Sequence, residues 1–264
     1  MIQHGKSTES DGTSLRRRGL SLGVRYNEGE VVSSGLRGEW RNEESNRPDN
    51  ALDRDTWLVS GFYETKVSED WRFVSSLDSV ISNSDQDSFR NGRYVEARLG
   101  YAWRPVANDR VNALFSYTYL YDMPGADQVN IDGEIEGPRQ KSHILNAAVN
   151  WQASPVWTLG AKYGYRMRRA AERDSDIFIR SEAHLGVLRA DYHVVHNWDL
   201  MAEIRALHMP ASNTTEKAAL AGVYRLFGDH LRVGGGYLWG EVSDDLRTID
   251  LPDRGVFLNM TSQF

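Results

Sequence analysis

The stretch Trp157–Met167, WTLGAKYGYRM, decides the fold class because its apolar and polar residues alternate without a break. Every odd-numbered position is apolar or aromatic, and the even-numbered positions include Lys162 and Arg166. Successive side chains of a β-strand point to opposite faces of the sheet. The stretch therefore predicts a strand with one apolar face and one polar, charged face.

The same period of two recurs along the chain, for example in VEARLGYAW (95–103), VNALFSYTYLY (111–121) and HILNAAVNW (143–151). It predicts thirteen strands, at about 15–26, 31–41, 56–66, 71–81, 93–104, 110–121, 142–152, 157–168, 178–194, 198–208, 216–227, 230–240 and 255–264. These strands are longer than the usual globular strand of about five or six residues and near the length of a tilted membrane-crossing strand. Their phase is least defined in 56–66, which is apolar on both sides, and in 177–190, where we expect a bulge or a phase change.

Short and long connections between the predicted strands alternate along the chain. This alternation predicts an up-and-down antiparallel meander with short turns at one end of the strands and long loops at the other. We therefore expect an all-β transmembrane barrel of about twelve to fourteen strands. The sequence has no cysteine, so disulfides and thiolate metal sites are excluded. Its 37 acidic residues outnumber its 31 basic ones, which argues against nucleic acid as a partner.

A soluble sandwich or lipocalin-like barrel would show the same alternation. The polar positions argue for a membrane barrel instead, because they are rich in cations while the apolar positions form an even band. We expect a water-filled lumen lined by cations. They either favour anions in permeation or pair with a plug, an upstream segment of the same chain or the few inward carboxylates. The proposed lumen-lining residues are Arg37, Arg72, Arg98, Lys162, Arg166, Arg168, Arg205, Arg225 and Arg232.

The eight tryptophans are all placed by the alternation at strand ends, as in the aromatic girdles at the two membrane interfaces. The predicted girdle consists of Trp40, Trp57, Trp71, Trp103, Trp151, Trp157, Trp198 and Trp239. No predicted helix covers the sheet. A closed barrel in lipid needs none.

The chain ends in GVFLNMTSQF (255–264), in which Val256, Leu258, Met260 and Phe264 alternate with polar residues. This end resembles the C-terminal targeting strand of bacterial outer-membrane proteins, and the resemblance implies recognition by the barrel-assembly machinery. From about Val111 onward the chain also resembles the C-terminal barrel region of large surface proteins of Gram-negative bacteria. This resemblance implies a place in the bacterial outer membrane, with outer-membrane lipid and lipopolysaccharide as partners. It carries no established chemistry.

An enzyme is not predicted, because no histidine has a serine two residues away on the same strand face. Acidic pairs such as Asp244–Asp245, Glu134/Glu136 and Asp174/Asp176 could hold calcium, but none has the ligand spacing of an EF-hand loop. We read them as solvated loops, and no metal or cofactor is predicted.

Thirteen is an odd strand count, whereas bacterial single-chain barrels have an even number. We interpret residues 1–14 as a truncated polar leader or external loop and 15–264 as the barrel, with a first strand either upstream or missed around 170–185. The expected function is a membrane anchor or translocation pore for upstream domains of a longer surface protein. The alternatives are a stand-alone porin-like channel for small polar or anionic solutes and, more remotely, a barrel enzyme.

Overall fold

The computed structural model describes residues 2–8, 14–46, 52–84, 93–122, 138–172, 175–194, 197–227, 231–247 and 254–262. All regular structure in these ranges is strand. The strands are β1 (Ile2–Thr8), β2 (Ser14–Glu28), β3 (Val32–Asn46), β4 (Leu52–Lys66), β5 (Trp71–Ser84), β6 (Arg93–Trp103), β7 (Val111–Tyr121), β8 (Arg139–Ser154), β9 (Trp157–Ala171), β10 (Ile179–Val194), β11 (Trp198–Met209), β12 (Thr214–Phe227), β13 (Leu231–Trp239) and β14 (Gly255–Ser262).

No helix long and apolar enough to cross a membrane occurs in the described ranges.

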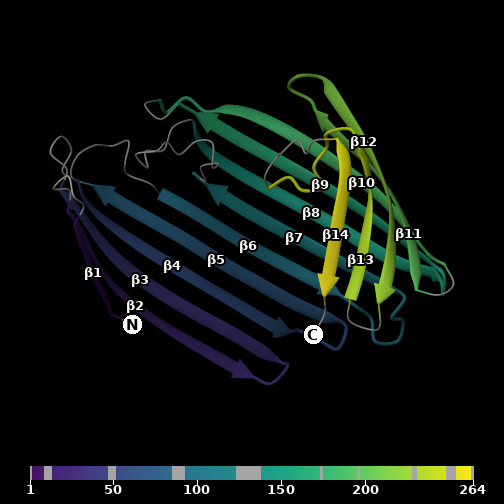
Figure 1. Cartoon of the computed structure of the whole chain (residues 1–264), viewed down its shortest axis with the longest axis horizontal. Helices are drawn as coiled ribbons and strands as arrows, with labels where there is room; N and C mark the ends of the chain where they lie inside the picture. Colours follow the sequence, from purple (N-terminus) through teal and green to yellow (C-terminus); the bar gives the residue numbers. More distant parts are fainter. Residues whose placement is uncertain are drawn as a thin grey trace.

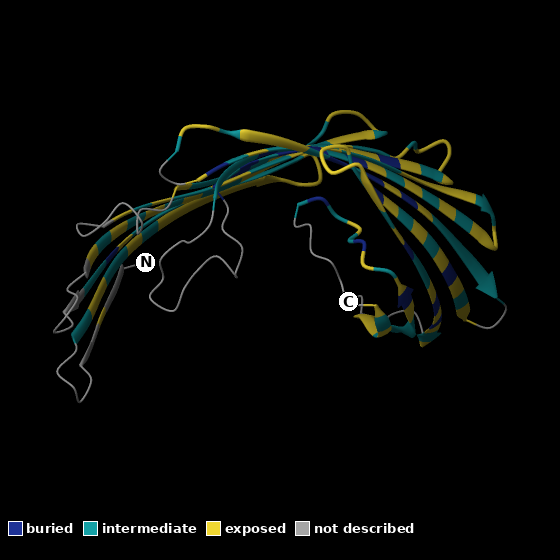
Figure 2. Cartoon of the chain, turned by 90° about the horizontal axis from the view of Figure 1, so that it is seen from above, coloured by how far each residue is buried: buried dark blue, intermediate teal, exposed yellow. Residues whose placement is uncertain are grey.

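The fourteen strands form one antiparallel sheet in which every strand pairs with its neighbour in sequence (Figure 1). Seen from above, the sheet curves into a trough (Figure 2). Its edges are β1 and β14, which do not pair with each other in the described part of the chain. The predicted all-β up-and-down architecture is confirmed, and the strand number lies within the predicted range.

The prediction for residues 1–14 was wrong in part, because Ile2–Thr8 form β1 and pair with β2 from Leu20 to Ser14. The missing strand therefore lies at this end of the sheet and not around 170–185. IQHGKST has no apolar alternation. Its backbone groups pair with those of β2.

Two details of the strands also differ from expectation. β3 runs on to Asn46 and β4 starts at Leu52, so this hairpin extends several residues beyond the predicted strands. The bulge expected in 177–190 is absent, since β10 pairs with β9 without interruption from Ile179 to Tyr192. Within the described ladders, an irregularity lies instead between Gln152 and Ser154.

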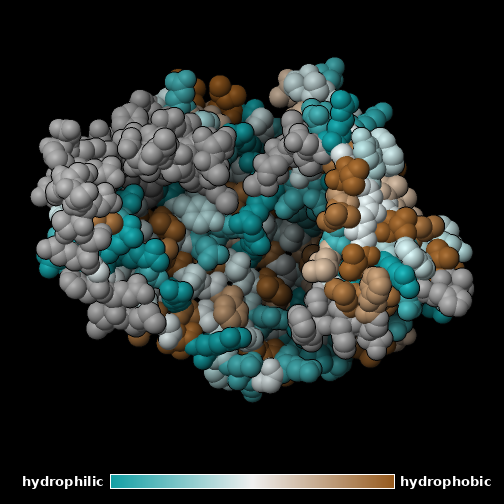
Figure 3. Space-filling view, viewed as in Figure 1, coloured by the Kyte–Doolittle hydropathy of each residue, from teal (hydrophilic) through white to brown (hydrophobic). Residues whose placement is uncertain are grey.

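The register assigns each residue to a face, because residues directly opposite each other share one side of a sheet. Arg37, Ser60, Asp78 and Glu96 follow one another across β3 to β6 on the concave face. Trp40 and Trp57 pair on the outward face. The hollow of the molecule is lined largely by hydrophilic side chains (Figure 3), whereas the outward face exposes large apolar side chains such as Val24, Leu188 and Ile204.

Candidate functional site

The segment Gly240–Arg247, which we name the inner loop, leaves the end of β13 and folds back inside the curve of the sheet (Figure 2). Gly240 makes this turn with a φ of 93°. A Cβ atom at this position would lie 2.5 Å from the carbonyl oxygen of Lys217. Glycine therefore fits here on two counts, the left-handed backbone and the close approach to β12.

Two apolar side chains anchor the inner loop to the concave face. Val242 and Leu246 have 0% and 1% of their surfaces exposed. They join a buried cluster with Leu120, Ile144, Ala183, Leu185, Val187, Leu207, Ala218 and Leu238. A Cβ on Gly164 would lie 2.9 Å from Leu246 Cδ1, so the glycine makes room for this anchor. Burying each anchor stabilises the loop by about 1.5–3 kcal/mol.

Three cations of the sheet bind the backbone of the inner loop. Arg205 donates to the Val242 carbonyl at 2.9 Å, and Lys162 donates to the Asp244 carbonyl at 2.5 Å. Arg166, only 6% exposed, donates to the Leu246 carbonyl at 2.9 Å and also to Ser142. These side chains satisfy carbonyl groups that a non-strand segment cannot pair in a ladder. They hold the loop in one position.

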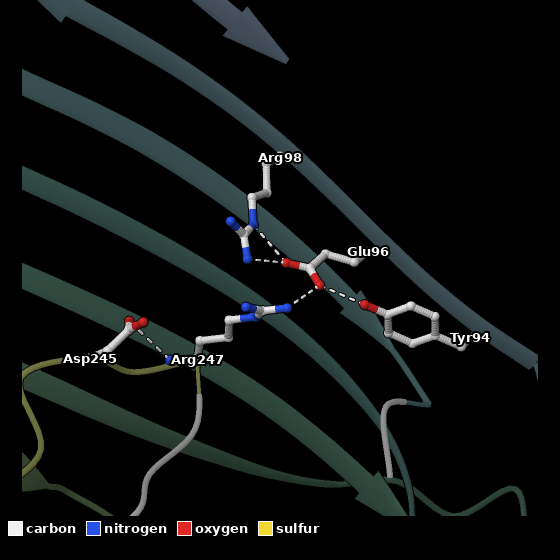
Figure 4. A network of polar contacts seen from close by, with 5 residues as sticks. All are labelled: Tyr94, Glu96, Arg98, Asp245 and Arg247. Carbon is white, nitrogen blue, oxygen red and sulfur yellow. Dashed lines mark hydrogen bonds and ion pairs between the residues drawn. The ribbon is translucent and has the colours of Figure 1, made fainter. Parts of the chain in front are cut away.

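The far end of the inner loop is held by a buried carboxylate (Figure 4). Glu96, 3% exposed, accepts hydrogen bonds from Tyr94, Arg98 and Arg247, and its ion pairs with both arginines measure 2.5 Å. Burial disfavours the charge of Arg247, but the hydrogen bond and attraction to Glu96 outweigh it and raise the pKa of the guanidinium. Asp245 accepts the backbone N–H of Arg247 and orients this end. The loop thus links β13 to β6 across the hollow.

Of the predicted lumen-lining residues, the register places Arg37, Arg72, Arg98, Lys162, Arg166, Arg168, Arg205 and Arg232 on the concave face. Several are matched by carboxylates: Arg37 with Glu39 at 2.7 Å, Arg72 with Glu64 at 2.6 Å, and Arg232 with Asp199 at 3.2 Å. Arg205 pairs with Glu203 as well as with the loop. Arg168 has no carboxylate partner among the described residues. Most of the predicted lumen-lining cations therefore form ion pairs within the sheet or hydrogen bonds to the inner loop.

The prediction for Arg225 was wrong. Arg225 lies opposite Trp198 and Val233, so it belongs to the outward face. Its guanidinium lies 5.3 Å from the ring centre of Trp198 and 5.0 Å from that of Phe227. This position at the short-turn rim lets the charge reach the interface while its stem stays on apolar surface.

The register places all eight predicted girdle tryptophans on the outward face. Trp71, Trp157 and Trp198 begin their strands, and Trp103 and Trp239 end theirs. Trp40 and Trp57 are different, because β3 and β4 continue well past them. Their predicted place at strand ends was wrong, and they mark the upper limit of the apolar band instead.

The tail residues Val256, Leu258 and Met260 all face outward and are strongly exposed. Phe264, the last member of the expected assembly signal, lies outside the described residues. The ring of Phe257 turns to the concave face and lies over Gly236, where a Cβ would come within 2.7 Å of it. This explains why an aromatic side chain stands in the polar set of this strand.

No family model and no curated protein matches the sequence. Solved structures do match. The siderophore receptor PirA from Acinetobacter baumannii is similar at a TM-score of 0.60 and 11% identity, over 89% of this chain and 41% of that one. The siderophore receptor PirA from Pseudomonas aeruginosa is similar at a TM-score of 0.60 and 10% identity, over 90% of this chain and 43% of that one. The copper transporter OprC is similar at a TM-score of 0.53 and 11% identity, over 94% of this chain and 47% of that one.

The chain has the fold of outer-membrane β-barrels. It spans less than half the length of these structures. The fold and the exposed apolar outward face place it in the bacterial outer membrane, as predicted, with the outward face toward lipid and the concave face toward the lumen.

The inner loop was not predicted from the sequence. A signal was present, because Ile144, Leu185, Val187 and Leu207 are apolar residues on the otherwise polar lumenal face. Such side chains need a cover in a water-filled lumen. Val242 and Leu246 in GEVSDDLR, spaced by four in a polar segment, provide that cover.

Proposed function

We propose that this chain forms the wall of an outer-membrane channel whose passage is narrowed by the inner loop. The observation that carries the proposal is the inner loop itself, held inside the trough by buried apolar anchors and by cations of the wall. A polar lumen with an inward segment sets the size and charge of what can pass. Small polar solutes are the class that such a lumen suits.

The charge of the passage differs from the one expected at first. Carboxylates match Arg37, Arg72, Arg98 and Arg232, and Arg166 is covered by the inner loop. Among the described residues, three of the predicted lumen-lining cations have no carboxylate ion pair: Lys162, Arg166 and Arg168, which lie beneath and beside the inner loop. We propose that any preference for anions arises at this constriction and not along the whole lumen.

Single-channel conductance in planar bilayers tests the proposal. Val242→Ser with Leu246→Ser removes both buried anchors and should release the loop, so conductance should rise about twofold or more over the wild type. Glu241→Gln is the control, since Glu241 is exposed within the same loop, and its conductance should match the wild type. Conductance steps in neither the wild type nor the released variant would overturn the channel.

The anchor or translocation role for upstream domains stays a prediction. It rests on the resemblance of the chain from about Val111 onward to the barrel region of large surface proteins, and not on a contact in the described residues. The bilayer measurement also separates the two roles, because an anchor whose lumen is filled by its own inner loop and passenger needs no conductance of its own.

A further inference from the structure

Three cations stand side by side on the lipid-facing side of the sheet. Lys141 in β8 lies directly opposite Arg169 in β9, and Arg169 lies directly opposite Arg180 in β10. We name these residues the cation row. Like charges in directly opposed positions destabilise a sheet. Negatively charged groups close to the cation row would therefore stabilise this part of the sheet.

Carboxylates supply only part of that charge. Arg180 forms an ion pair with Glu182, and the neighbouring Arg139 pairs with Asp176 at 2.9 Å. Lys141 lies 4.6 Å from the ring centre of Phe178. Neither Lys141 nor Arg169 has a carboxylate partner in the described part of the chain. Among the described residues, positive charge therefore exceeds negative charge on this surface.

The other half of the same rim is balanced. On the lipid-facing side of β2 and β3, Arg16 and Arg18 both lie near Glu44, at 3.9 and 3.5 Å. Asp55 accepts the indole N–H of Trp40 at 3.1 Å on this same surface. The described cations on this surface of β2 and β3 are thus matched by carboxylates, in contrast to those of β8–β10.

The position of the cation row corresponds to the lipid headgroups. Arg169 comes twelve residues after Trp157 in β9, at the end that carries the long loops. At about 3.3 Å per residue and a tilt of about 40°, this places it roughly 30 Å above the short-turn girdle. The apolar band of such barrels is about 25 Å tall. The cation row therefore lies at the outer headgroup level.

A belt of tyrosine and histidine lies just below the row. Tyr163 and His184 share a hydrogen bond of 2.8 Å, and the rings of Tyr165 and His184 are 5.0 Å apart. Below the belt, small residues on β8–β12 form an apolar groove of about 1010 Å³ with Ala161, Gly186 and Ala206 in its lining. Leu188, Ile204 and Trp239 also line it. From the long-loop rim toward the membrane midplane, the outward face thus carries first the cation row, then the tyrosine and histidine belt, and then the apolar groove.

We propose that this surface binds lipopolysaccharide, with its phosphate groups on the cation row and an acyl chain in the apolar groove. Phosphates supply the missing charge, and arginine binds them through paired hydrogen bonds. The row spans three strands, about 10 Å. This width suits a headgroup with more than one phosphate better than a single phosphate. The inference does not depend on the channel.

Binding of diphosphoryl lipid A to the refolded chain in detergent micelles, measured by native mass spectrometry, tests the proposal. Lys141→Gln, Arg169→Gln and Arg180→Gln together should weaken binding about tenfold or more, because charge-assisted hydrogen bonds to phosphate are lost. Arg16→Gln with Arg18→Gln is the matched control on the balanced half of the rim and should bind like the wild type. Dephosphorylated lipid A should bind the wild type as weakly as lipid A binds the triple variant.

Equal binding of lipid A by wild type and triple variant would overturn the proposal. Phosphatidylglycerol bound as tightly as lipid A would also overturn it, since the surface would then recognise any anionic lipid. If the triple variant does not refold, Arg169→Gln alone serves, because Arg169 has no described ion pair to lose. It should still weaken binding several-fold.

Discussion

At the residue scale, Glu96 concentrates most of the interactions that close the inner loop. It is buried and accepts from three donors on two separate parts of the chain. Removing one partner of a buried ion pair leaves the other charge uncompensated. Arg98 and Arg247 are partly exposed, which lets water recover some of that loss.

We expect Glu96→Gln to lower the free energy of unfolding by about 3 kcal/mol, at the lower end of the range for buried pairs. Glu64→Gln is the matched control, because Glu64 and Arg72 form an exposed pair on the same face and such pairs contribute about 0–1 kcal/mol. Urea unfolding in detergent micelles, followed by tryptophan fluorescence, measures both. Equal losses in the two variants would mean that the Glu96 network does not secure the loop.

At the element scale, the alternation of apolar and polar residues predicted which face of a strand meets lipid and which meets the lumen. It did so wherever the lipid-facing side chains are apolar along the whole strand. It misled at β12, where Leu220 and Tyr224 are apolar on the lumenal side and Arg225 is charged on the lipid side. A cation that lies against aromatic rings at the membrane interface is tolerated on the lipid-facing side. Its charge therefore does not indicate a lumenal position. The apolar residues of the lumenal face indicated that something covers them. The segment that does so could not be predicted, because the burial of its two apolar side chains depends on contacts far along the chain.

The assignment of faces predicts a difference between two apolar residues of similar exposure. Ile204 is 57% exposed on the lipid-facing side, and Leu114 is 49% exposed on the lumenal side opposite Ala102 and Ala148. Ile204→Arg should destabilise the barrel by about 2–4 kcal/mol, the range for a cation near the bilayer midplane. Leu114→Arg meets water and should cost much less. Reversible unfolding in lipid vesicles compares them, and a larger loss for Leu114→Arg would reverse the two faces.

At the scale of the whole molecule, the fourteen strands put β1 and β14 at the two edges of one sheet and running in opposite directions. An unpaired edge exposes N–H and C=O groups that lipid cannot satisfy, and each unsatisfied group costs several kcal/mol. Antiparallel edges are suited to pair, so the even strand number fits closure in a way that the thirteen predicted strands did not.

We therefore expect β1 and β14 to pair when the chain is in the membrane. Each variant carries two cysteines, one within residues 2–8 and one within residues 255–262. These are the only thiols of the chain, since it has no native cysteine. Opposed pairs whose Cα atoms come within about 4.4–6.8 Å should oxidise to disulfides within one molecule, visible as a shift in gel mobility. Pairs offset along the strands should not react, which identifies the register. Disulfides formed only between different molecules would show instead that the two edges meet in an assembly of several chains.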